Sequence, residues 1–253
     1  FALFIGIGTA LAGETAKPVE DFFSGLSAVI YKITDLIMQL APFGVFALVM
    51  PVAALNGTKS LLPLATVIVT VYLGCILYMA VVYSGAVSIL GGMEPVRFFR
   101  GIFPAMLVAF STCSSNASLP VNLECATENL GIETGKSGSC LPFDATFNMD
   151  GTAIYQGVCA LFVAQVYGIE LGLGHYAIIV LTGTLASIGT AGVPFSGLIM
   201  LSVVLQSVGL PMEGIALIAG IDRLLDMIRT TVNITGKAAC CVVARNGENK
   251  YCE

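Results

Sequence analysis

The stretch DRLLDMIRTTVNITGK, residues 222–237, decides the fold. Its polar and charged side chains follow one another at spacings of 4, 3, 4 and 4 positions: Asp222, Asp226, Arg229, Asn233 and Lys237. At about 100° per residue, these spacings place all five in one stripe of a helix, less than a quarter-turn wide. Leu, Ile, Met, Val and Ala side chains occupy most of the other faces. The stretch therefore predicts a helix with one polar face in apolar surroundings.

The rest of the sequence identifies these surroundings as a membrane. Of the 253 residues, 57% are hydrophobic and 11% are charged, whereas a soluble domain carries roughly 25% charged residues. Five runs contain no Asp, Glu, Lys or Arg: 36–58, 60–93, 101–123, 151–169 and 171–212. A helix needs about 20 apolar residues to cross a bilayer. Helices are expected rather than barrel strands, because the runs do not alternate between apolar and polar residues.

The composition also excludes several classes of protein. The formal net charge is -5, so a nucleic-acid partner is not expected, because phosphate binding needs a basic patch. The eight cysteines form no CxxC pattern, and His175 is the single histidine. A zinc site or a histidine-based catalytic triad is therefore not expected. The segment 1–12 is too short to span a membrane and looks like the end of a helix, so we expect a piece of a longer protein.

Two uncharged runs are interrupted by small polar residues, FSTCSSNASLP at 110–120 and SIGTAGVP at 187–194. Non-helical backbone at membrane depth is tolerated only inside protein or beside a water-filled cavity. We therefore predict two re-entrant helical hairpins with polar tips, each followed by a helix that carries charge. Matching interruptions in two halves of a chain indicate the binding site of a secondary transporter. The expected fold is an all-α membrane protein with inverted-repeat pseudo-symmetry.

The stripe at 222–237 has the chemistry of an acidic amino-acid site. Arg229 is suited to bind a carboxylate bidentately, Asp226 to accept from an ammonium, and Asn233 to donate to a second carboxylate. The alternative is a salt-bridge ladder that joins helices. Against it stands the insertion cost of about 2.5–3.5 kcal/mol for each charge in mid-membrane.

A second group of polar residues offers hard oxygen ligands. Asn148, Asp150 and Thr152 supply an amide, a carboxylate and a hydroxyl where the helix is interrupted. Further backbone carbonyls come from the second hairpin tip, at Ser187, Ile188 and Thr190. Such oxygens on unwound backbone suit a small cation such as Na⁺. The alternative for 148–152 is a Gly-kinked helix whose polar groups satisfy one another.

Together, FSTCSSNASLP, NMDGT (148–152), SIGTAGVP and DRLLDMIRTTVNITG resemble the dicarboxylate/amino acid:cation symporter family, which includes glutamate transporters. The resemblance covers the whole chain and matches the C-terminal part of such a protein. It implies that 1–92 are scaffold helices, with the end of helix four and helices five and six, the last bordering the transport core. It implies that 93–253 form this core, with hairpin one, helix seven, hairpin two and helix eight.

The resemblance also implies a function. A full-length member is a homotrimer that crosses the cell (inner or plasma) membrane several times and contacts its lipid. It carries L-glutamate or L-aspartate by secondary active symport with Na⁺ and/or H⁺, and it needs no cofactor besides these coupling ions. It is not an enzyme.

The resemblance assigns substrate contacts to matching positions. Arg229, helped by Thr152, would hold the side-chain carboxylate of the substrate, and Asp226 would hold its ammonium. Asn233 would hold the α-carboxylate together with backbone at Ser115.

Gating and cation binding are assigned in the same way. Val193 and Gly197 would close the second tip as a gate. One cation would lie deep in the fold, at Asn148 and Asp150. Another would lie beneath the second hairpin, held in part by backbone carbonyls: Thr146, Ser187, Ile188 and Thr190.

Three departures from the family pattern stand out. Lys237 occupies a position where Na⁺-coupled members use Asp in one cation site. Asp144 occupies the position of a Gly whose carbonyl serves the same site. We predict that these two residues form an internal ion pair, so that the ammonium replaces one coupled cation; an alternative is a proton exchanged between them. Phe195 stands where a small residue is usual, which is expected to alter the gate.

Other functions were weighed against this one. A C4-dicarboxylate:cation symporter is the nearest alternative, although a dicarboxylate has no ammonium for Asp226. A membrane-embedded hydrolase with Ser114 or Ser115 as nucleophile would need a general base. The single histidine, His175, ends the Gly-rich LGLGH (171–175), which is expected at a membrane surface, so this base is missing. A channel would show rings of charges or carbonyls from repeated subunits, whereas this site is asymmetric within one chain.

Overall fold

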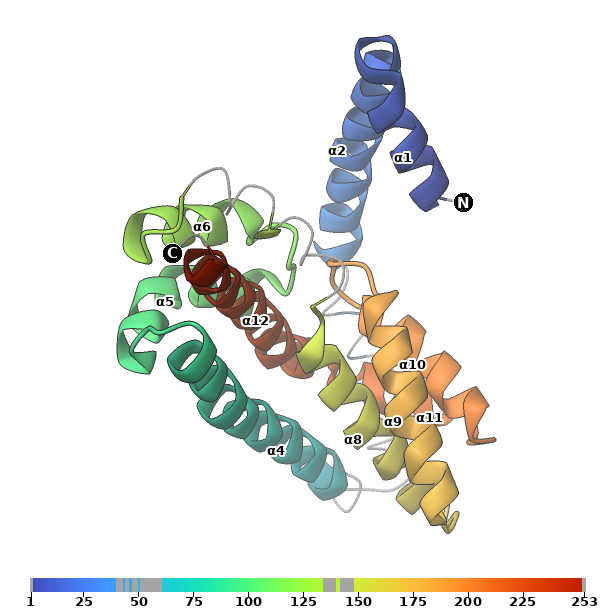
Figure 1. Cartoon of the computed structure of the whole chain (residues 1–253). Coiled ribbons are helices and arrows are strands. Elements are labelled where there is room, and N and C mark those ends of the chain that lie inside the picture. The colour runs from blue at the N-terminus through green and yellow to red at the C-terminus, as the bar shows by residue number, and fades with distance from the viewer. Residues whose placement is uncertain are drawn as a thin grey trace. The chain divides into compact units, whose positions relative to one another are not determined.

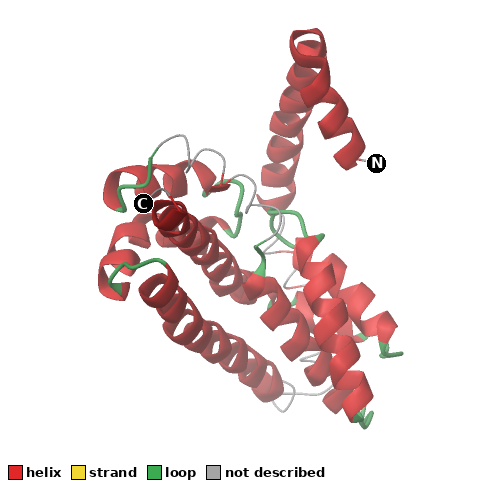
Figure 2. Cartoon of the chain, viewed as in Figure 1, coloured by secondary structure: helices red, strands yellow, loops and turns green. Residues whose placement is uncertain are grey.

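The computed structural model describes residues 2–39, 61–133 and 148–251, together with 43, 46, 50, 140 and 141. Within these ranges the chain forms helices and loops and contains no strand (Figure 2). The all-helical architecture predicted from the sequence is therefore confirmed for the described residues. The chain divides into two compact units, Phe1–Ala47 and Leu48–Glu253.

Two helices with described bounds lie in the first unit. Helix α1 (Ala2–Ala12) and helix α2 (Lys17–Gln39) are joined by the 3-10 turn Gly13–Ala16. The polar composition of GETAKPVEDF (13–22) by itself predicts a loop, and this prediction is wrong, because α2 already begins at Lys17. Pro18 lies in the first turn, where its missing N–H leaves no helical hydrogen bond unmade.

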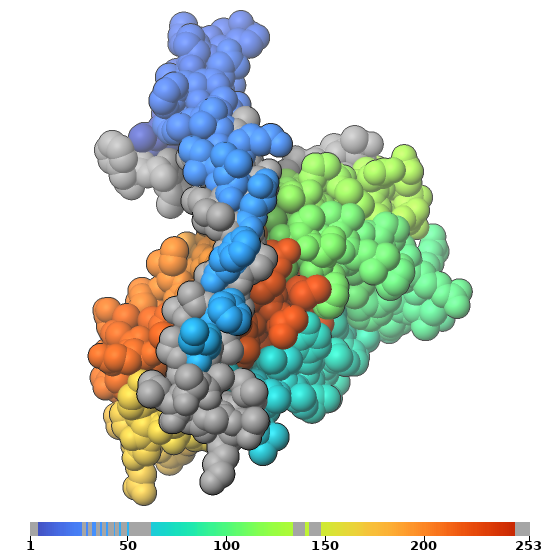
Figure 3. Space-filling view, turned by 180° about the vertical axis from the view of Figure 1, so that it is seen from behind, coloured from blue at the N-terminus to red at the C-terminus, as the bar shows by residue number. Residues whose placement is uncertain are grey.

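The second unit contains the four motifs quoted above and is built around its last helix. Its helices with described bounds are α4 (Leu61–Tyr78), α5 (Pro95–Thr112), α6 (Leu119–Glu124), α8 (Asp150–Val166), α9 (Leu173–Ile188), α10 (Ser196–Ser207), α11 (Gly214–Ala219) and α12 (Asp222–Tyr251). The π-helical segments η3 (Met79–Tyr83) and η4 (Ala86–Leu90) continue α4, and the π-helical segment η5 (Cys125–Asn129) continues α6. Helix α12 runs through the middle of this unit and contacts α4, α5 and α8 (Figure 1). From behind, the segment 95–133 (green) lies beside α4 and its continuation (cyan) (Figure 3).

Helix α4 and its continuation have the length and hydropathy of a membrane span. The segment Leu62–Leu90 is 29 residues long and contains an 18-residue window with a mean hydropathy of 2.3, and it is the one helix of this kind among the described residues. One side of α4 is buried at Val71 and Cys75, whereas Leu73 and Leu77 are exposed. An apolar exposed side of this kind suits contact with lipid.

Two helical hairpins follow in the chain. Helices α5 and α6 contact each other across a tip at 113–118, and α9 and α10 do so across a tip at 189–195. Helices α9 and α10 have 16 and 12 residues, fewer than the roughly 20 that a single crossing needs. The two helix–turn–helix pairs predicted at these places are therefore present.

The last predicted helix differs from the observed one. The apolar pattern around 222–237 extends from 214 to about 243 and by itself predicts one helix over this range, but α11 ends at Ala219 and α12 begins at Asp222. Gly220 lies at this break, and glycine is a poor helix former. Helix α11 also packs closely on α8, because a Cβ at Gly214 would collide with Val163. Similarly, α8 begins at Asp150, so this acid starts a helix rather than interrupting one.

Candidate functional site

The polar stripe of α12 lies inside the second unit. Asp226, Arg229 and Asn233 are each 2% exposed. The Arg229 guanidinium donates to Asp226 Oδ1 from Nη2 at 2.8 Å and from Nε at 3.1 Å. Because buried charges are costly unless they are paired, this ion pair is what allows both residues to be buried.

The guanidinium of Arg229 is enclosed by two other helices. Its Cζ atom lies 4.7 Å from the ring centroid of Tyr155 on α8, a cation–π contact. On α10, a Cβ at Gly197 would collide with the guanidinium. Gly197 is therefore the residue that lets α10 approach Arg229.

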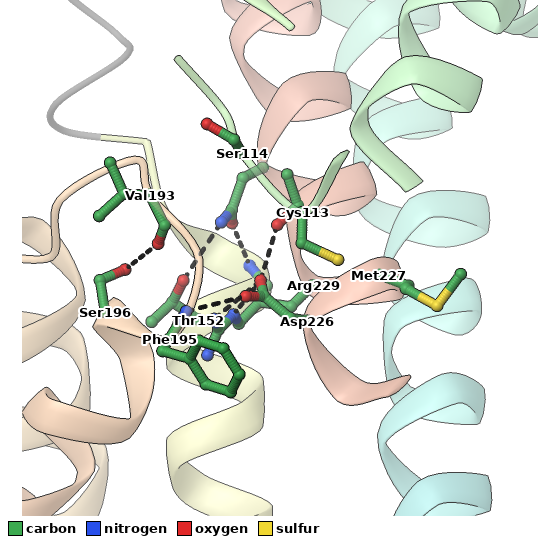
Figure 4. A network of polar contacts seen from close by, with 12 residues as sticks. Cys113, Ser114, Thr152, Val193, Phe195, Ser196, Asp226, Met227 and Arg229 are labelled. Carbon is green, nitrogen blue, oxygen red and sulfur yellow. Dashed lines mark hydrogen bonds and ion pairs between the residues drawn. The ribbon is translucent and has the colours of Figure 1, made fainter. Parts of the chain in front are cut away.

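Asp226 joins α12 to the second hairpin tip. Its Oδ1 accepts from the Thr230 hydroxyl at 2.8 Å, and its Oδ2 accepts from the backbone N–H of Phe195 at 3.3 Å. Figure 4 shows Asp226 and Arg229 pointing from α12 toward this tip, whereas Met227 points the other way. The carboxylate is thus surrounded by donors from its own helix and from the tip.

Asn233 joins α12 to the start of α8. Its Nδ2 donates to Thr152 Oγ1 at 3.2 Å and lies 3.3 Å from Met149 Sδ, and its Oδ1 accepts from the Gly151 N–H at 2.9 Å. A Cβ at Gly151 would collide with the carbonyl of Arg229. The glycine of the NMDGT motif therefore brings Thr152 against the polar stripe.

The two hairpin tips touch each other above these residues. The Gly192 carbonyl accepts from the backbone N–H of Asn116 at 3.1 Å and from the Ser114 hydroxyl at 2.9 Å. Cys113 and Phe195, one in each tip, have φ of 56° and 62°, and they are the two non-glycine residues with positive φ among those described. Such backbone is sparsely populated and often marks functional sites.

The cavity enclosed here has a volume of about 10 Å³, which is room for one water molecule at most. Its lining includes seven of the expected site residues: Ser115, Thr152, Thr190, Val193, Asp226, Arg229 and Asn233. An amino acid fits only if the tips separate. A larger cavity of about 610 Å³ lies between α4 and α8, but it is lined by apolar side chains with Thr66, Thr70 and Gln165 and by no charged group.

The expected cation ligands Asn148 and Asp150 lie at the start of α8. Asp150 Oδ2 accepts from the hydroxyls of Tyr78 at 3.1 Å and Tyr83 at 2.9 Å. Asn148 Nδ2 donates to Cys240 Sγ at 3.2 Å, whereas its Oδ1 is buried and accepts from no described residue. A carboxylate and a buried amide oxygen fit the ligand chemistry of Na⁺.

Two residues that were expected to hold another cation donate their hydroxyls to backbone carbonyls three or four residues earlier in the chain. Ser187 Oγ donates to the Thr184 carbonyl at 2.8 Å, and Thr190 Oγ1 donates to the Ala186 carbonyl at 2.8 Å. Ile188 is 37% exposed. These positions therefore offer backbone carbonyls rather than hydroxyls as ion ligands. Thr146, expected at the same site, lies outside the described residues.

Lys237 continues the stripe and is fully buried, at 0% exposure. It is among the largest fully buried side chains of the described chain. Asp144, its predicted partner, lies outside the described residues. A buried ammonium on α12 nevertheless argues against a Lys237 side chain that reaches out to solvent.

The sequence alone did not reveal several contacts of the site. The hydroxyls of Tyr78 and Tyr83 and the ring of Tyr155 belong to apolar runs, where an aromatic residue is more often part of a core. Thr230 lies one turn after Asp226 and therefore on nearly the same helical face, so its spacing could have identified it as a member of the polar stripe. The N–H of Phe195 carries no signal, because only the tertiary fold brings it to Asp226.

Comparison with known proteins assigns the chain to a family. Residues 1–246 match the model of the "Sodium:dicarboxylate symporter family". The chain is 37% identical over 253 residues to the proton/sodium-glutamate symport protein of Geobacillus stearothermophilus, covering 100% of this chain and 60% of that relative. It is 37% identical over 252 residues to the proton/glutamate-aspartate symporter of Escherichia coli (strain K12), covering 99% and 57%. It is 38% identical over 238 residues to human excitatory amino acid transporter 2, covering 93% and 42%.

The family match and the arrangement of the motifs in the structure agree. The chain spans about 60% of the length of its bacterial relatives. The motifs that carried the resemblance in sequence, the two hairpin tips, NMDGT and the α12 stripe, come together in one place. The chain belongs to the sodium:dicarboxylate symporter family.

Proposed function

We propose that the full-length protein is a secondary active symporter that carries L-aspartate or L-glutamate across a membrane with Na⁺ and/or H⁺. The observation that carries this proposal is the buried cluster of Asp226, Arg229 and Asn233, which lies beneath two touching hairpin tips. The names of the relatives, glutamate and glutamate-aspartate symporters and excitatory amino acid transporters, support the same substrate class.

In this proposal each charged group of the substrate has a partner. Arg229 and Thr152 hold the side-chain carboxylate, and Asp226 holds the ammonium. Asn233 holds the α-carboxylate together with backbone at Ser115. The contact between Asn233 and Thr152, at 3.2 Å, supports a shared site for these groups.

Asp226 favours an amino acid over a C4-dicarboxylate, which remains the second candidate substrate. A dicarboxylate carries two negative charges and no ammonium. It would leave a buried carboxylate facing another negative group, and like charges at close range are unfavourable.

Coupling ions would bind at two places in the same core. One is Asn148 with Asp150, supported by the buried Asn148 oxygen that accepts from no described residue. The other uses backbone at Ser187, Ile188 and Thr190, with Thr146.

Lys237 is proposed to stand in for one coupled cation, paired with Asp144. Its complete burial supports this role, because an ammonium in a buried oxygen site has the same charge as a bound Na⁺. The pair would reduce the number of ions carried with each substrate.

The remaining architecture follows the family. Residues 93–253 form the transport core and 1–92 form scaffold helices of a multi-pass homotrimer in the cell membrane. The two hairpins are re-entrant and related by inverted pseudo-symmetry, and the second tip, with Val193 and Gly197, is the gate. The short α9 and α10 and the paired positive-φ residues support this arrangement.

The test is uptake by the full-length protein in proteoliposomes. Radiolabelled L-aspartate and L-glutamate should accumulate against their own gradient when a Na⁺ or H⁺ gradient is imposed, and succinate should compete poorly. Succinate uptake that exceeds aspartate uptake would establish the dicarboxylate alternative instead. Flux that only follows the substrate's own gradient would exclude symport.

A further inference from the structure

The expected cation site at the start of α8 has two partners that the proposed function does not use. The hydroxyls of Tyr78 and Tyr83 both donate to Asp150 Oδ2, at 3.1 Å and 2.9 Å. Neither hydroxyl therefore occupies the other carboxylate oxygen, Oδ1. The two rings pack edge to face, with their centroids 5.1 Å apart, and Tyr83 is 4% exposed. Asp150 is thus held by a packed pair of phenols.

This pair depends on an unusual turn of the helix. Tyr78 and Tyr83 are five positions apart, and in a regular α-helix residues at this spacing point about 140° away from each other. The segment Met79–Tyr83 is π-helical, and the Ser84 N–H donates to the Met79 carbonyl five residues earlier. Hydrogen bonds of a π-helix join residues i and i+5, so residues five apart lie on nearly the same side. The π-helical turn therefore brings both hydroxyls to one carboxylate.

The Tyr83 hydroxyl also lies beside the other expected ligand, Asn148. A Cβ at Gly236 would collide with the Tyr83 hydroxyl oxygen and with Asn148 Oδ1, so both oxygens lie against this glycine of α12. Asn148 Oδ1 is buried and accepts from no described residue, whereas Nδ2 of the same amide donates to Cys240. The Asp150 carboxylate, the Tyr83 hydroxyl and the Asn148 oxygen therefore lie together. Hard oxygen atoms of this kind are suited to a small cation.

A purely structural tyrosine contact looks different on the same helix. Tyr72 of α4 donates its hydroxyl to the Leu224 carbonyl of α12 at 2.9 Å, which joins two helices without a charged group. The Tyr83 oxygen lies 3.3 Å from the Val232 carbonyl of α12, but it lies closer to Asp150 Oδ2, at 2.9 Å. Carboxylates that bind a metal ion are typically oriented by such outer hydrogen-bond donors.

We propose that Tyr78 and Tyr83 are positioning residues of the Na⁺ site, and that the π-helical turn Met79–Tyr83 holds them against Asp150. This deepens the proposed function and rests on it, because that function assigns a coupling ion to Asn148 and Asp150. The two hydroxyls fix one orientation of the carboxylate before the ion arrives. Less ordering is then needed when the ion binds, which strengthens binding.

The same carboxylate connects the ion to the substrate contacts. Asp150 is followed in α8 by Gly151 and Thr152, which contact Asn233 through a backbone N–H and a hydroxyl. Ion binding at Asp150 and substrate binding at Asn233 should therefore favour each other, and such coupling is reciprocal. A variant that binds Na⁺ weakly should need more Na⁺ to bind substrate, yet should regain the parent's substrate affinity once Na⁺ saturates.

The experiment compares Tyr78→Phe and Tyr83→Phe with the parent in the full-length protein. Calorimetry measures L-aspartate binding at increasing NaCl, with choline chloride replacing NaCl to keep the ionic strength constant. Loss of a hydrogen-bonded partner of a metal ligand typically weakens metal binding by roughly 10–100-fold. Each variant should therefore need at least about tenfold more Na⁺ for half-maximal binding. Their L-aspartate affinity at saturating Na⁺ should match that of the parent.

Tyr72→Phe is the matched control. It removes the same hydroxyl from the same helix, but at a contact with the Leu224 carbonyl instead of Asp150. This variant should keep the Na⁺ dependence of the parent, even where it unfolds at a lower temperature. The increase of Tm on adding NaCl gives a second readout, which should shrink in Tyr78→Phe and Tyr83→Phe but not in Tyr72→Phe.

Two outcomes would overturn the positioning role while leaving the proposed function intact. One is an unchanged Na⁺ dependence in both Tyr78→Phe and Tyr83→Phe. The other is an equal loss in Tyr72→Phe, which would indicate a general effect on packing. Asp150→Asn distinguishes these from a failure of the proposed function, because it should weaken Na⁺ binding more than either tyrosine variant. A parent-like Na⁺ dependence in Asp150→Asn would overturn the proposed ion site, and the positioning role with it.

Discussion

The two hairpin tips carry similar residues but are held in different ways. The first hairpin is fixed to α12 by contacts outside the cavity: Arg223 donates to the Ser111 carbonyl at 2.9 Å, and Asn122 donates to the Ile234 carbonyl at 3.3 Å. Four residues of its tip are buried, among them Ser115 at 3% exposure and Ser118 at 0%, whereas Ala117 is exposed. The first tip therefore forms a fixed wall of the site.

The second tip is held by the site itself. Its residues 192–196 are half-buried. Phe195 donates to Asp226, and Gly192 accepts from the first tip. A substrate ammonium would compete for Asp226, so binding would change the contacts that hold this tip. The two tips therefore differ in what holds them: the first hairpin has hydrogen bonds to α12 outside the cavity, whereas the second tip is bonded to Asp226 and to the first tip.

The largest effect is expected from joining the two tips covalently. The Cβ of Ser115 lies 3.2 Å from the place of a Cβ on Gly192, close to the Cβ separation of a disulfide, which is about 3.5–4.5 Å. Oxidised Ser115→Cys/Gly192→Cys should lose all transport, because the second tip can no longer open. Uptake before and after reduction measures this, with the two single variants as controls. Full transport by the oxidised double variant would show that the second tip does not gate the site.

The second largest effect is expected from replacing Arg229, which lines the cavity beneath the two tips. Arg229→Ala should weaken binding of L-aspartate and L-glutamate more than a hundredfold, because removing one partner of a buried ion pair costs about 3–5 kcal/mol. Calorimetry on the full-length protein measures it. Arg97→Ala is the matched control, because Arg97 is exposed on α5. Unchanged acidic amino-acid binding in Arg229→Ala would remove the basis for the proposed substrate.

A third change acts on the second hairpin alone. Gly197→Ala places a methyl group against the Arg229 guanidinium, so α10 must move away from α12. We expect about a tenfold loss of substrate affinity, which corresponds to about 1.4 kcal/mol. Gly174→Ala in α9 is the control, because no atom lies within 4 Å of its Cβ position. If both variants bind equally well, close approach of α10 is not needed for the site.

The smallest effect is expected at the contact between the tips. Ser114→Ala removes one of the two hydrogen bonds to the Gly192 carbonyl, and a hydrogen bond contributes about 0.5–1.5 kcal/mol. Affinity should fall only a few-fold, and the second tip should become more accessible to proteolysis. Ser111→Ala is matched to it, since that hydroxyl donates to Val108 within its own helix. Equal protease sensitivity of the two variants would show that the hydrogen bond from Ser114 to the Gly192 carbonyl does not hold the two tips together.

The sequence predicted the parts of the site that follow from local periodicity. The spacing of Asp226, Arg229 and Asn233 placed them on one helical face, and the structure has them so, because a helix repeats every 3.6 residues whatever surrounds it. The polar interruptions at 110–120 and 187–194 likewise became the two tips. These features depend on neighbouring residues alone.

Features that depend on tertiary packing were not predicted. The break at Gly220 was missed because the apolar pattern continues across it and only the packing of Gly214 on Val163 fixes α11 separately. The contacts of Tyr78 and Tyr83 with Asp150 join residues 72 and 67 positions apart. The polar composition of 13–22 suggested a loop, although a polar helix start has the same composition.

The backbone of Phe195 bears on the speed of the proposed transport cycle. A non-glycine residue with φ of 62° is strained, by about 1–3 kcal/mol. In this conformation its N–H donates to Asp226; if the tip opens as proposed and Phe195 then leaves positive φ, the closed tip stores this energy and opening releases it. The strain raises the free energy of the closed state and thus lowers the barrier to reopening, by about tenfold in rate for each 1.4 kcal/mol. Phe195→Gly, which adopts positive φ without strain, should therefore bind substrate more tightly and complete fewer cycles per second.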